Sequence, residues 1–343
     1  MADPRDPIAD LKRIAFLLEA MQEPGYRVRA FRSAATTLAE MAADDIADRA
    51  ATGRLRELAG IGEVTERTIL ESLRGEEPVY LRRLESTEGT PQEEGAATLR
   101  AALKGDLHAH TEASDGHFTI AEMAEAAIEL GHEYLVITDH SPRLSIANGL
   151  STERLLAQLD EIERLNAELA PFRLLTGIEV DINEDGTLDQ SDEILSRLDV
   201  VVGSMHSALR MESRPMTRRM VAALANPRLD VLGHCTGRMK RRRRSRPEST
   251  FDADIVFAAA HRFDKAIEIN CLPDRLDPPK RLLRLAVEAG CRVSIDSDAH
   301  YLGQLAWVRV GCERAFLCGV TAPMVVNAMG TDDLLSWTAS HEA

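Results

Sequence analysis

The spacing of hydrophobic residues changes near residue 105, and this change divides the chain into two parts. Up to about residue 85, apolar residues recur at helical intervals, as at Leu11, Ile14 and Leu18. From residue 105 onward, short continuous apolar runs alternate with segments of helical periodicity. The pattern predicts a small all-α domain over residues 1–85 and a larger α/β domain over residues 105–343.

The stretch between these parts, residues 86–104, is polar and is interrupted by Gly89, Pro91 and Gly95. Glycine and proline end regular elements and are typical of connecting segments. We therefore expect a linker that leads into a short entry helix.

Seven apolar segments in the second part predict strands, at residues 105–110, 134–140, 173–182, 199–206, 231–235, 266–271 and 292–298. Helical segments are expected between them, at 119–131, 152–169, 189–197, 214–226, 250–262 and 278–290, with a last helical stretch after 303. Continuous apolar strands indicate a parallel sheet covered by helices, and closure into a barrel is the arrangement we expect. In such barrels the chemistry collects at the carboxyl ends of the strands.

Side chains that bind metals follow the predicted strands. His108 and His110 are two residues apart, so both imidazoles leave one face of a strand, and Asp115 in the next loop can turn toward them. Further histidines and carboxylates end the later strands: His140, Glu179, His206, His234, Asp298 and His300. They can form a buried hydrogen-bond network, but so many ionisable groups together are costly without cations. The mixed set favours Zn²⁺ or Mn²⁺, with Fe²⁺ as a further option.

Three other residues near the strand ends have expected roles. Asp139 and Asp181 are expected to orient ligand imidazoles, and the alternative is ordinary hydrogen bonding in the core. His132 follows Gly131 at the predicted end of a helix, where a partial positive charge is favourable.

The strand-end motifs resemble those of the PHP (polymerase and histidinol phosphatase) family. They occur in order as Asp106-Leu-His-Ala-His, Thr138-Asp-His, Gly177-Ile-Glu, His206, Gly233-His and Asp298-Ala-His. The resemblance implies a distorted seven-stranded (β/α)7 barrel that holds two or three divalent metal ions. Carried over by position, the resemblance implies three ion sites. The first ion would bind His108, His110, Glu179 and Asp298, and Glu179 would also bridge to a second ion bound by His206 and His234. The third ion would bind Asp115, His140 and His300.

A glycine turn, Gly60-Ile61-Gly62, separates two short helical segments in the first part. Its backbone amides can bind a phosphate, although a plain glycine-capped turn is the alternative. With the run Gly25–Ala35, the turn resembles the N-terminal helix-hairpin-helix domain of family X DNA polymerases. The resemblance implies weak, salt-sensitive DNA contacts at Gly60, Gly62, Arg27, Arg29 and Arg32. The lysine nucleophile of that family aligns with Thr68, so no lyase chemistry is expected.

Composition and charge restrict the class of protein further. The 343 residues carry a formal net charge of −15, which argues against a surface that binds nucleic acid throughout. Five cysteines without a Cys-x-x-Cys motif argue against a disulfide framework. The chain has neither an apolar run near the roughly 18 residues of a membrane span nor the pattern of a signal peptide. We expect a cytoplasmic protein that does not contact a membrane.

The basic run Lys240–Arg246 stands out in this acidic chain. Such runs are usually solvated loops, but this one begins shortly after His234. Together with Arg143 and Arg238, it is expected to surround the metal site and attract polyanions. Bacterial family X polymerases carry a similar His-x-Thr-Gly-Arg sequence, so the resemblance makes Arg238 the first candidate for a phosphate contact; a surface role is the alternative.

These features together predict an enzyme that hydrolyses phosphate esters with a metal-activated water. DNA ends are the expected substrate, through 3′–5′ exonuclease or 3′-phosphatase activity in DNA repair. Residues 86–104 are too few to contain a polymerase domain. One alternative is a small-molecule phosphatase of the histidinol-phosphate type, and another is a DNA-binding adaptor with an inert barrel. The sequence does not identify the protein partners.

Overall fold

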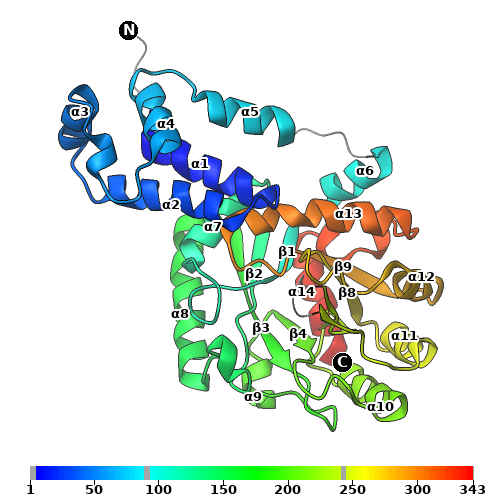
Figure 1. The fold of residues 1–343 in the computed structure, drawn as a ribbon. Helices are drawn as coiled ribbons and strands as arrows, with labels where there is room; N and C mark the ends of the chain where they lie inside the picture. The colour runs from blue at the N-terminus through cyan, green and yellow to red at the C-terminus, as the bar shows by residue number, and fades with distance from the viewer. Residues whose placement is uncertain (1–4, 89–92, 241–244, 343) are drawn as a thin grey trace. The chain divides into compact units, whose positions relative to one another are not determined.

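Figure 1 shows the computed structural model, which describes residues 5–88, 93–240 and 245–342. The chain forms two compact units, residues 1–91 and 92–343. Within the described ranges, no helix is both long and apolar enough to cross a membrane.

The first unit is all helical. Its helices are α1 (Pro7–Ala20), α2 (Gly25–Ala39), α3 (Ala43–Ala51), α4 (Glu63–Leu73) and α5 (Val79–Glu88), with a 3-10 turn at Leu55–Glu57. The carboxylate of Asp6 caps α1 by accepting a hydrogen bond from the Ile8 amide at 2.8 Å. Leu11 and Ile14 of α1 are fully buried, as is Leu38 of α2, so the helical spacing seen in the sequence marks the core of this unit.

The expected linker over residues 86–104 is largely helical. The helix α5 extends to Glu88, and α6 (Glu94–Ala102) belongs to the second unit. Leu99 of α6 joins an apolar cluster with Val308 and Cys312 of α13 (Val308–Leu317). A side chain at Gly95 would begin only 2.0 Å from the ring of Phe316. The glycine that suggested a linker therefore allows α6 to pack closely on α13.

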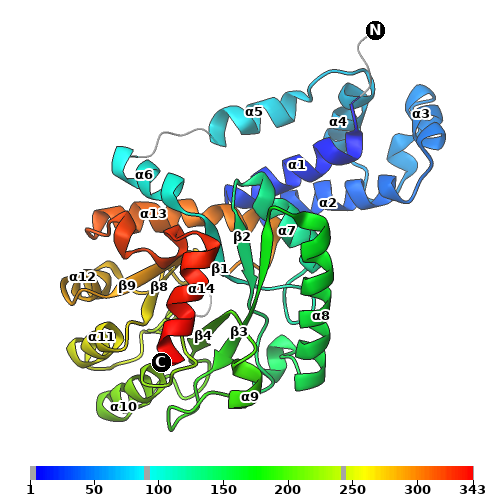
Figure 2. The same cartoon turned by 180° about the vertical axis from the view of Figure 1, so that it is seen from behind.

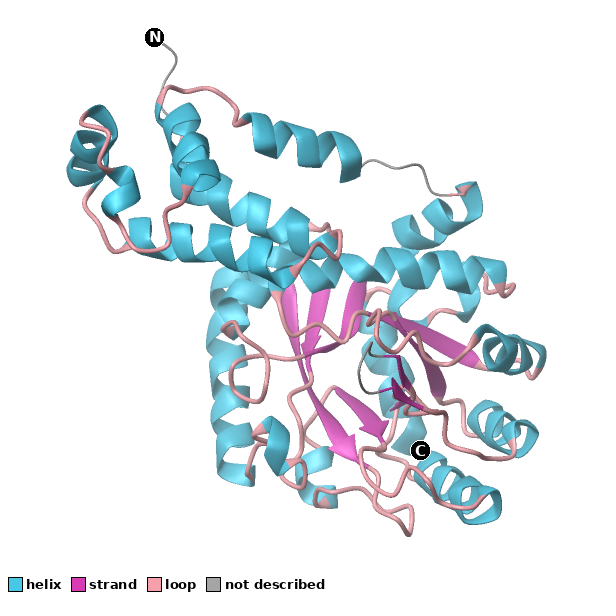
Figure 3. Ribbon diagram, in the orientation of Figure 1, coloured by secondary structure: helices cyan, strands magenta, loops and turns pink. Residues whose placement is uncertain are grey.

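The second unit contains a seven-stranded parallel sheet, which confirms the predicted strands. In sheet order the strands are β1 (Gly105–Ala109), β2 (Tyr134–Ile137), β3 (Arg173–Asp181), β4 (Val200–Ser204), β5 (Val231–Leu232), β8 (Ala266–Asn270) and β9 (Arg292–Asp296). The helices around them are α7 (Ile120–Glu129), α8 (Thr152–Leu169), α9 (Asp192–Leu195), α10 (Ser213–Leu224), α11 (Ala253–Arg262), α12 (Lys280–Glu288) and α13 (Figure 3).

The first and last strands meet and nearly close the sheet into a barrel. Ala109 forms a parallel bridge with Ala299, and the His110 amide donates to the Ala299 carbonyl at 2.8 Å. The Asp298 amide donates to the His108 carbonyl at 3.0 Å. The expectation of a distorted seven-stranded (β/α)7 barrel is confirmed.

The helix α14 (Thr331–Ala339) covers the amino-terminal end of this barrel (Figure 2). Leu334 and Trp337 belong to an apolar cluster with residues from the barrel strands. Beyond the helix, His341 Nδ1 lies 2.7 Å from Asp230 Oδ1, directly before β5. The carboxyl ends of the strands are left for the functional residues.

A short hairpin precedes α11 and was not predicted. Its strands β6 (Met239–Lys240) and β7 (Ser245–Arg246) are antiparallel. They contain the two ends of the basic run, whereas Arg241–Arg244 lie outside the described residues.

His132 is buried in the turn between α7 and β2, contrary to the expected charged role at a helix end. Both ring nitrogens lack a hydrogen-bond partner in the described part of the chain. Burial, reinforced by the nearby Arg100, lowers the pKa of His132 to about 3. Apolar packing around the ring thus outweighs the helix-end effect, and the imidazole is neutral at pH 7.

Replacement of His132 by leucine is expected to weaken the acid sensitivity of the fold. An unfolded histidine takes up a proton near pH 6.5, whereas folded His132 does so only near pH 3. The contribution of neutral His132 to the free energy of unfolding is therefore fully present above pH 6.5. It is lost as the pH falls below that value, by up to about 1.4 kcal/mol per pH unit. Urea unfolding at pH 6.5 and 5 should show a smaller loss for His132→Leu than for the wild type. The control His261→Gln, at an exposed position, should keep the wild-type loss; an unchanged loss in His132→Leu would contradict the prediction.

Candidate metal centre

Four of the predicted ligands lie together where β1, β3 and β9 end. His108 Nε2 and His110 Nε2 are 3.4 and 3.6 Å from Glu179 Oε2. They are 3.9 and 3.3 Å from Asp298 Oδ1. Two ligands of one zinc ion, each roughly 2.0–2.2 Å from it, are separated by about 3–3.5 Å. The spacing of these four side chains therefore suits a shared cation.

Two further groups adjoin the first. His206 Nε2 and His234 Nε2 lie 3.3 and 2.8 Å from Glu179 Oε1. In the other group, His140 Nε2 and His300 Nε2 are both 3.4 Å from Asp115 Oδ1. The structure thus brings together all nine residues that the sequence suggested.

One ring departs from the division into three ion sites. His140 Nδ1 lies 2.8 Å from Glu179 Oε2 while its Nε2 faces Asp115. The ring of His110 also stacks on that of His140, with centroids 4.5 Å apart. His110 and His140 therefore lie between neighbouring groups of ligands. The structure defines the nine candidate ligands better than it defines which of them would share an ion.

Buried imidazole nitrogens that lack a hydrogen-bond partner indicate whether cations fit at this centre. Six imidazole nitrogens have no hydrogen-bond partner in the described residues: His108 Nε2, both nitrogens of His110, His140 Nδ1, His206 Nε2 and His234 Nδ1. Native proteins rarely leave buried polar atoms unsatisfied. Four of them, His108 Nε2, His110 Nε2, His140 Nδ1 and His206 Nε2, lie between 2.8 and 3.6 Å from an oxygen of Glu179. The site therefore fits divalent metal ions.

The electrostatics of the centre support the same conclusion. Burial alone would raise the pKa of Glu179, but His206, His140 and His108 outweigh it and hold that pKa well below its usual range. Burial and the neighbouring His300 and His140 lower the pKa of His110 to about 4. Despite their burial, Glu268, Glu179 and Asp298 raise the pKa of His108 well above its usual value, and Glu179 and Asp115 raise the pKa of His140 to about 10. Without ions these rings carry the protons that offset the carboxylates, and divalent ions would take the place of those protons.

A second layer of carboxylates holds the imidazoles. Glu268 Oε1 lies 2.5 Å from His108 Nδ1, and Asp181 Oδ1 lies 2.7 Å from His206 Nδ1. Each contact directs the opposite ring nitrogen, Nε2, toward Glu179. Glu268 had no role assigned from the sequence, although a carboxylate inside an apolar strand was a usable signal.

Asp139 does not orient an imidazole. Its carboxylate accepts hydrogen bonds from the Thr111 amide at 2.8 Å, from the Ser114 hydroxyl at 2.5 Å and from Gln158 Nε2 at 2.6 Å. Because successive residues of an extended chain point to opposite sides, Asp139 turns away where His140 turns in. It instead fixes the loop that carries Asp115.

Arg238 is also placed differently from the expectation. Its guanidinium is buried, donates from Nε to the Arg275 carbonyl at 2.8 Å, and lies 3.5 Å from Glu248. These contacts give it a structural role in the loops. Arg143 is about half exposed, with Nε 3.9 Å from Asp181 Oδ2, and stays a candidate for a phosphate contact.

Arg275 was missed because nothing in its sequence neighbourhood marks it. It lies in the loop after β8, and its Nε is 3.2 Å from Asp298 Oδ2. Asn270 Nδ2 donates to the same oxygen at 3.0 Å. The two side chains leave Asp298 Oδ1 to face His110 and His108.

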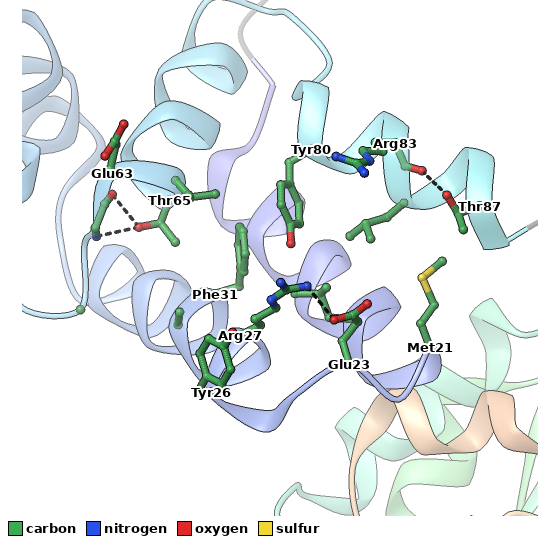
Figure 4. A pocket seen from close by; sticks show the side chains of 16 residues that line it. Met21, Glu23, Tyr26, Arg27, Phe31, Glu63, Thr65, Tyr80, Arg83 and Thr87 are labelled. Atoms are coloured by element: carbon green, nitrogen blue, oxygen red, sulfur yellow. Dashed lines mark hydrogen bonds and ion pairs between the residues drawn. The ribbon is translucent and has the colours of Figure 1, made fainter.

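The predicted DNA contacts of the first unit lie partly in ion pairs. The first unit has a cavity of about 680 Å³. Figure 4 shows Arg27 in its lining, near Tyr26, Phe31 and Tyr80. Arg27 pairs with Glu23 at 2.7 Å, and Arg32 pairs with Glu19 at 2.5 Å. Both pairs would have to open before these arginines could bind phosphate, whereas Arg29 is exposed.

The glycine turn has the backbone that the sequence suggested. Gly60 has a φ of +79°, and a Cβ there would lie 2.3 Å from Ser33 Oγ. Gly62 is the N-cap residue directly before α4, and its amide donates to Thr65 Oγ1 at 2.9 Å. That amide is already engaged, which restricts phosphate binding at the turn.

Known proteins similar to this chain were then compared with it. The family model described as PHP domain matches residues 106–271. The DNA polymerase/3′-5′ exonuclease PolX of Bacillus subtilis is 40% identical over 232 residues, covering 68% of this chain. The chain spans only 40% of the length of that relative.

Shorter relatives match over most of their length. A probable phosphatase of Caldanaerobacter subterraneus subsp. tengcongensis is 31% identical over 217 residues, which is 60% of this chain and 79% of that protein. The crystal structure of a histidinol phosphate phosphatase from Lactococcus lactis, complexed with zinc, L-histidinol and phosphate, is 16% identical with a TM-score of 0.47. The match covers 64% of this chain and 94% of that one. Because the chain covers 79% of the probable phosphatase from Caldanaerobacter at 31% identity, and the family model matches residues 106–271, the chain belongs to the PHP domain family.

Proposed function

We propose that this protein is a metal-dependent phosphoesterase and that DNA ends are its substrates. The observation that carries the proposal is the convergence of nine ligand-type side chains, Glu179 among them, with buried imidazole nitrogens that lack a hydrogen-bond partner in the described part of the chain. Two or three divalent ions, with Zn²⁺, Mn²⁺ and Fe²⁺ as the candidates, would activate a water molecule and neutralise phosphate oxygens.

The protein side chains have distinct tasks in this proposal. Glu179 would hold the groups of ligands together, because imidazoles approach both of its oxygens. Glu268 and Asp181 would keep His108 and His206 directed at the ions. Arg143, half exposed beside Asp181, would receive the phosphate of an incoming substrate.

Two observations support DNA ends as the substrate. The relative from Bacillus subtilis is named a DNA polymerase and 3′-5′ exonuclease, and its similarity spans most of this chain. The glycine turn of the first unit resembles that of a helix-hairpin-helix, a motif that binds the DNA backbone. Polymerase activity does not follow, because the chain spans 40% of that relative.

A small-molecule phosphatase is the second candidate. The chain covers 79% of the probable phosphatase from Caldanaerobacter and 89% of one from Thermoanaerobacter. An adaptor with an inert barrel has less support, because an inert site would not be expected to keep a complete set of ligands.

Glu179→Gln is expected to abolish metal binding and activity together. An amide cannot supply the two anionic oxygens on which the ligands converge, so hydrolysis of p-nitrophenyl phosphate should fall by about 10³-fold. Elemental analysis should show the loss of bound metal. The exposed Glu129→Gln should behave like the wild type. A wild-type protein that holds less than one metal ion per chain after loading with Zn²⁺ or Mn²⁺ would contradict the proposal.

Glu268→Gln and Asp181→Asn should each weaken metal binding without removing it. Loss of a carboxylate that orients an imidazole typically lowers metal affinity by about 10–100-fold. Competition with a chromogenic chelator measures this change. The control is Asp185→Asn, at an exposed position in the loop after β3. Equal metal affinities in all three variants would show that Glu268 and Asp181 do not contribute to metal binding.

The two substrate classes can be separated directly. An oligonucleotide with a 3′-phosphate should be hydrolysed with a kcat/KM roughly 10²-fold higher than that of histidinol phosphate, because the half-exposed Arg143 beside the centre attracts a polyanion more than it attracts an organic cation. An oligonucleotide with only a 5′-phosphate tests the choice of end. Preference for histidinol phosphate would replace the DNA proposal by the second candidate.

A further inference from the structure

A cavity of about 550 Å³ adjoins the candidate metal centre. It is formed by the loop after β4 and the segment after β7, and its lining residues are His206, Ala208, Leu209, Arg210, Met211, Arg246, Pro247, Glu248 and Thr250. His206 also lies 3.3 Å from Glu179 Oε1. A ligand with its phosphate at the metal centre would therefore extend into this cavity.

The walls of the cavity are held by buried hydrogen bonds. Arg219 of α10, which is buried, donates from Nη1 to the Ser207 carbonyl and from Nε to the Asn183 carbonyl, each at 2.9 Å. The Ser249 hydroxyl donates to the Leu209 carbonyl at 2.9 Å. The cavity is thus formed before a ligand arrives, which lowers the entropic cost of binding.

The lining combines an apolar surface with a positive rim. Leu209, Met211 and Pro247 offer flat apolar contact, while Arg210 is exposed at the edge. The carboxylate of Glu248 is paired with Arg281 and lies 3.5 Å from Arg238 Nη1, so its charge is offset. This chemistry suits an uncharged aromatic group attached to phosphates and disfavours an organic cation such as histidinol.

We propose that this cavity binds the base of the terminal nucleotide, whose 3′ oxygen carries the phosphate that is removed. The next phosphate along the DNA strand would lie at Arg210. This inference rests on the proposed function and adds to it a subsite that reads the presence of a base at the DNA end.

Two oligonucleotides that differ in one base test the subsite. Both carry a 3′-phosphate, and in one of them the terminal nucleotide is abasic. Contact of the base with Leu209, Met211 and Pro247 would remove apolar surface from water, so the wild type should show a KM roughly tenfold lower for the intact substrate, with a similar kcat. Pro247→Trp, a change at an exposed wall residue that fills the cavity, should remove this difference.

Arg210→Ala tests the phosphate contact separately. It should keep the preference for a terminal base but reduce the slope of log KM against log salt concentration by about 0.7, the value for one phosphate of a single strand. Arg214→Ala, an exposed arginine outside the cavity, is the matched control and should leave both quantities unchanged.

A readout without turnover completes the test. An oligonucleotide that ends in 2-aminopurine and a hydrolysis-resistant phosphonate should give a saturable fluorescence change with the wild type and none with Pro247→Trp. Equal KM values for intact and abasic substrates would overturn the subsite and leave the proposed function standing. Hydrolysis of p-nitrophenyl phosphate but of neither oligonucleotide, with no fluorescence change, would overturn both.

Discussion

The carboxylate of Glu179 is buried among imidazoles, and five of them place a nitrogen within 3.6 Å of it. Removing so many ionisable groups from water is unfavourable unless they neutralise one another or bind cations. The surrounding contacts follow from that constraint. Glu268 and Asp181 hold rings, Arg275 and Asn270 hold Asp298, and Asp139 holds the loop of Asp115. The carboxyl end of the barrel is thus organised around a charge requirement, and its amino end around apolar packing of α14.

The sequence predicted the strands and the nine candidate ligands because both depend on local pattern. When an apolar run of about five residues ends in histidine or aspartate, that polar residue lies at the carboxyl end of a strand and hence at the barrel rim. Its position does not depend on the conformation of the loops. Side chains in loops are different. Arg238 follows Gly237, whose φ is +59°. The direction of its side chain depends on hydrogen bonds that the guanidinium donates to the carbonyl groups of Arg275 and Leu276, in a loop far along the chain. Arg275 comes from that same loop, so neither its burial nor its contact with Asp298 was visible in the sequence.

Smaller errors had equally physical causes. Asp139 and His140 are neighbours, and a shift of one position decides which of them faces the centre. His132 has the sequence context of a helix end, but tertiary packing excludes water from its ring and keeps it neutral. Gly95 was one of the residues that suggested a linker. In the structure it lies in α6, and its missing side chain leaves space for the ring of Phe316. For His132 and Gly95 a long-range contact decided the outcome, whereas for Asp139 the alternation of side chains along the extended segment decided it.

The seam between β1 and β9 also has a consequence for biosynthesis. His108 and Asp298 belong to one candidate site, yet they are contributed by the first and last strands of the barrel, nearly two hundred positions apart. A ribosome would release the first eight strands of the second unit before Asp298 emerged, so the nascent chain carries an incomplete set of ligands for most of translation. Contacts of such high sequence separation form late and slowly. Acquisition of metal would then mark the end of folding, and bound ions would hold together the two strands that join last.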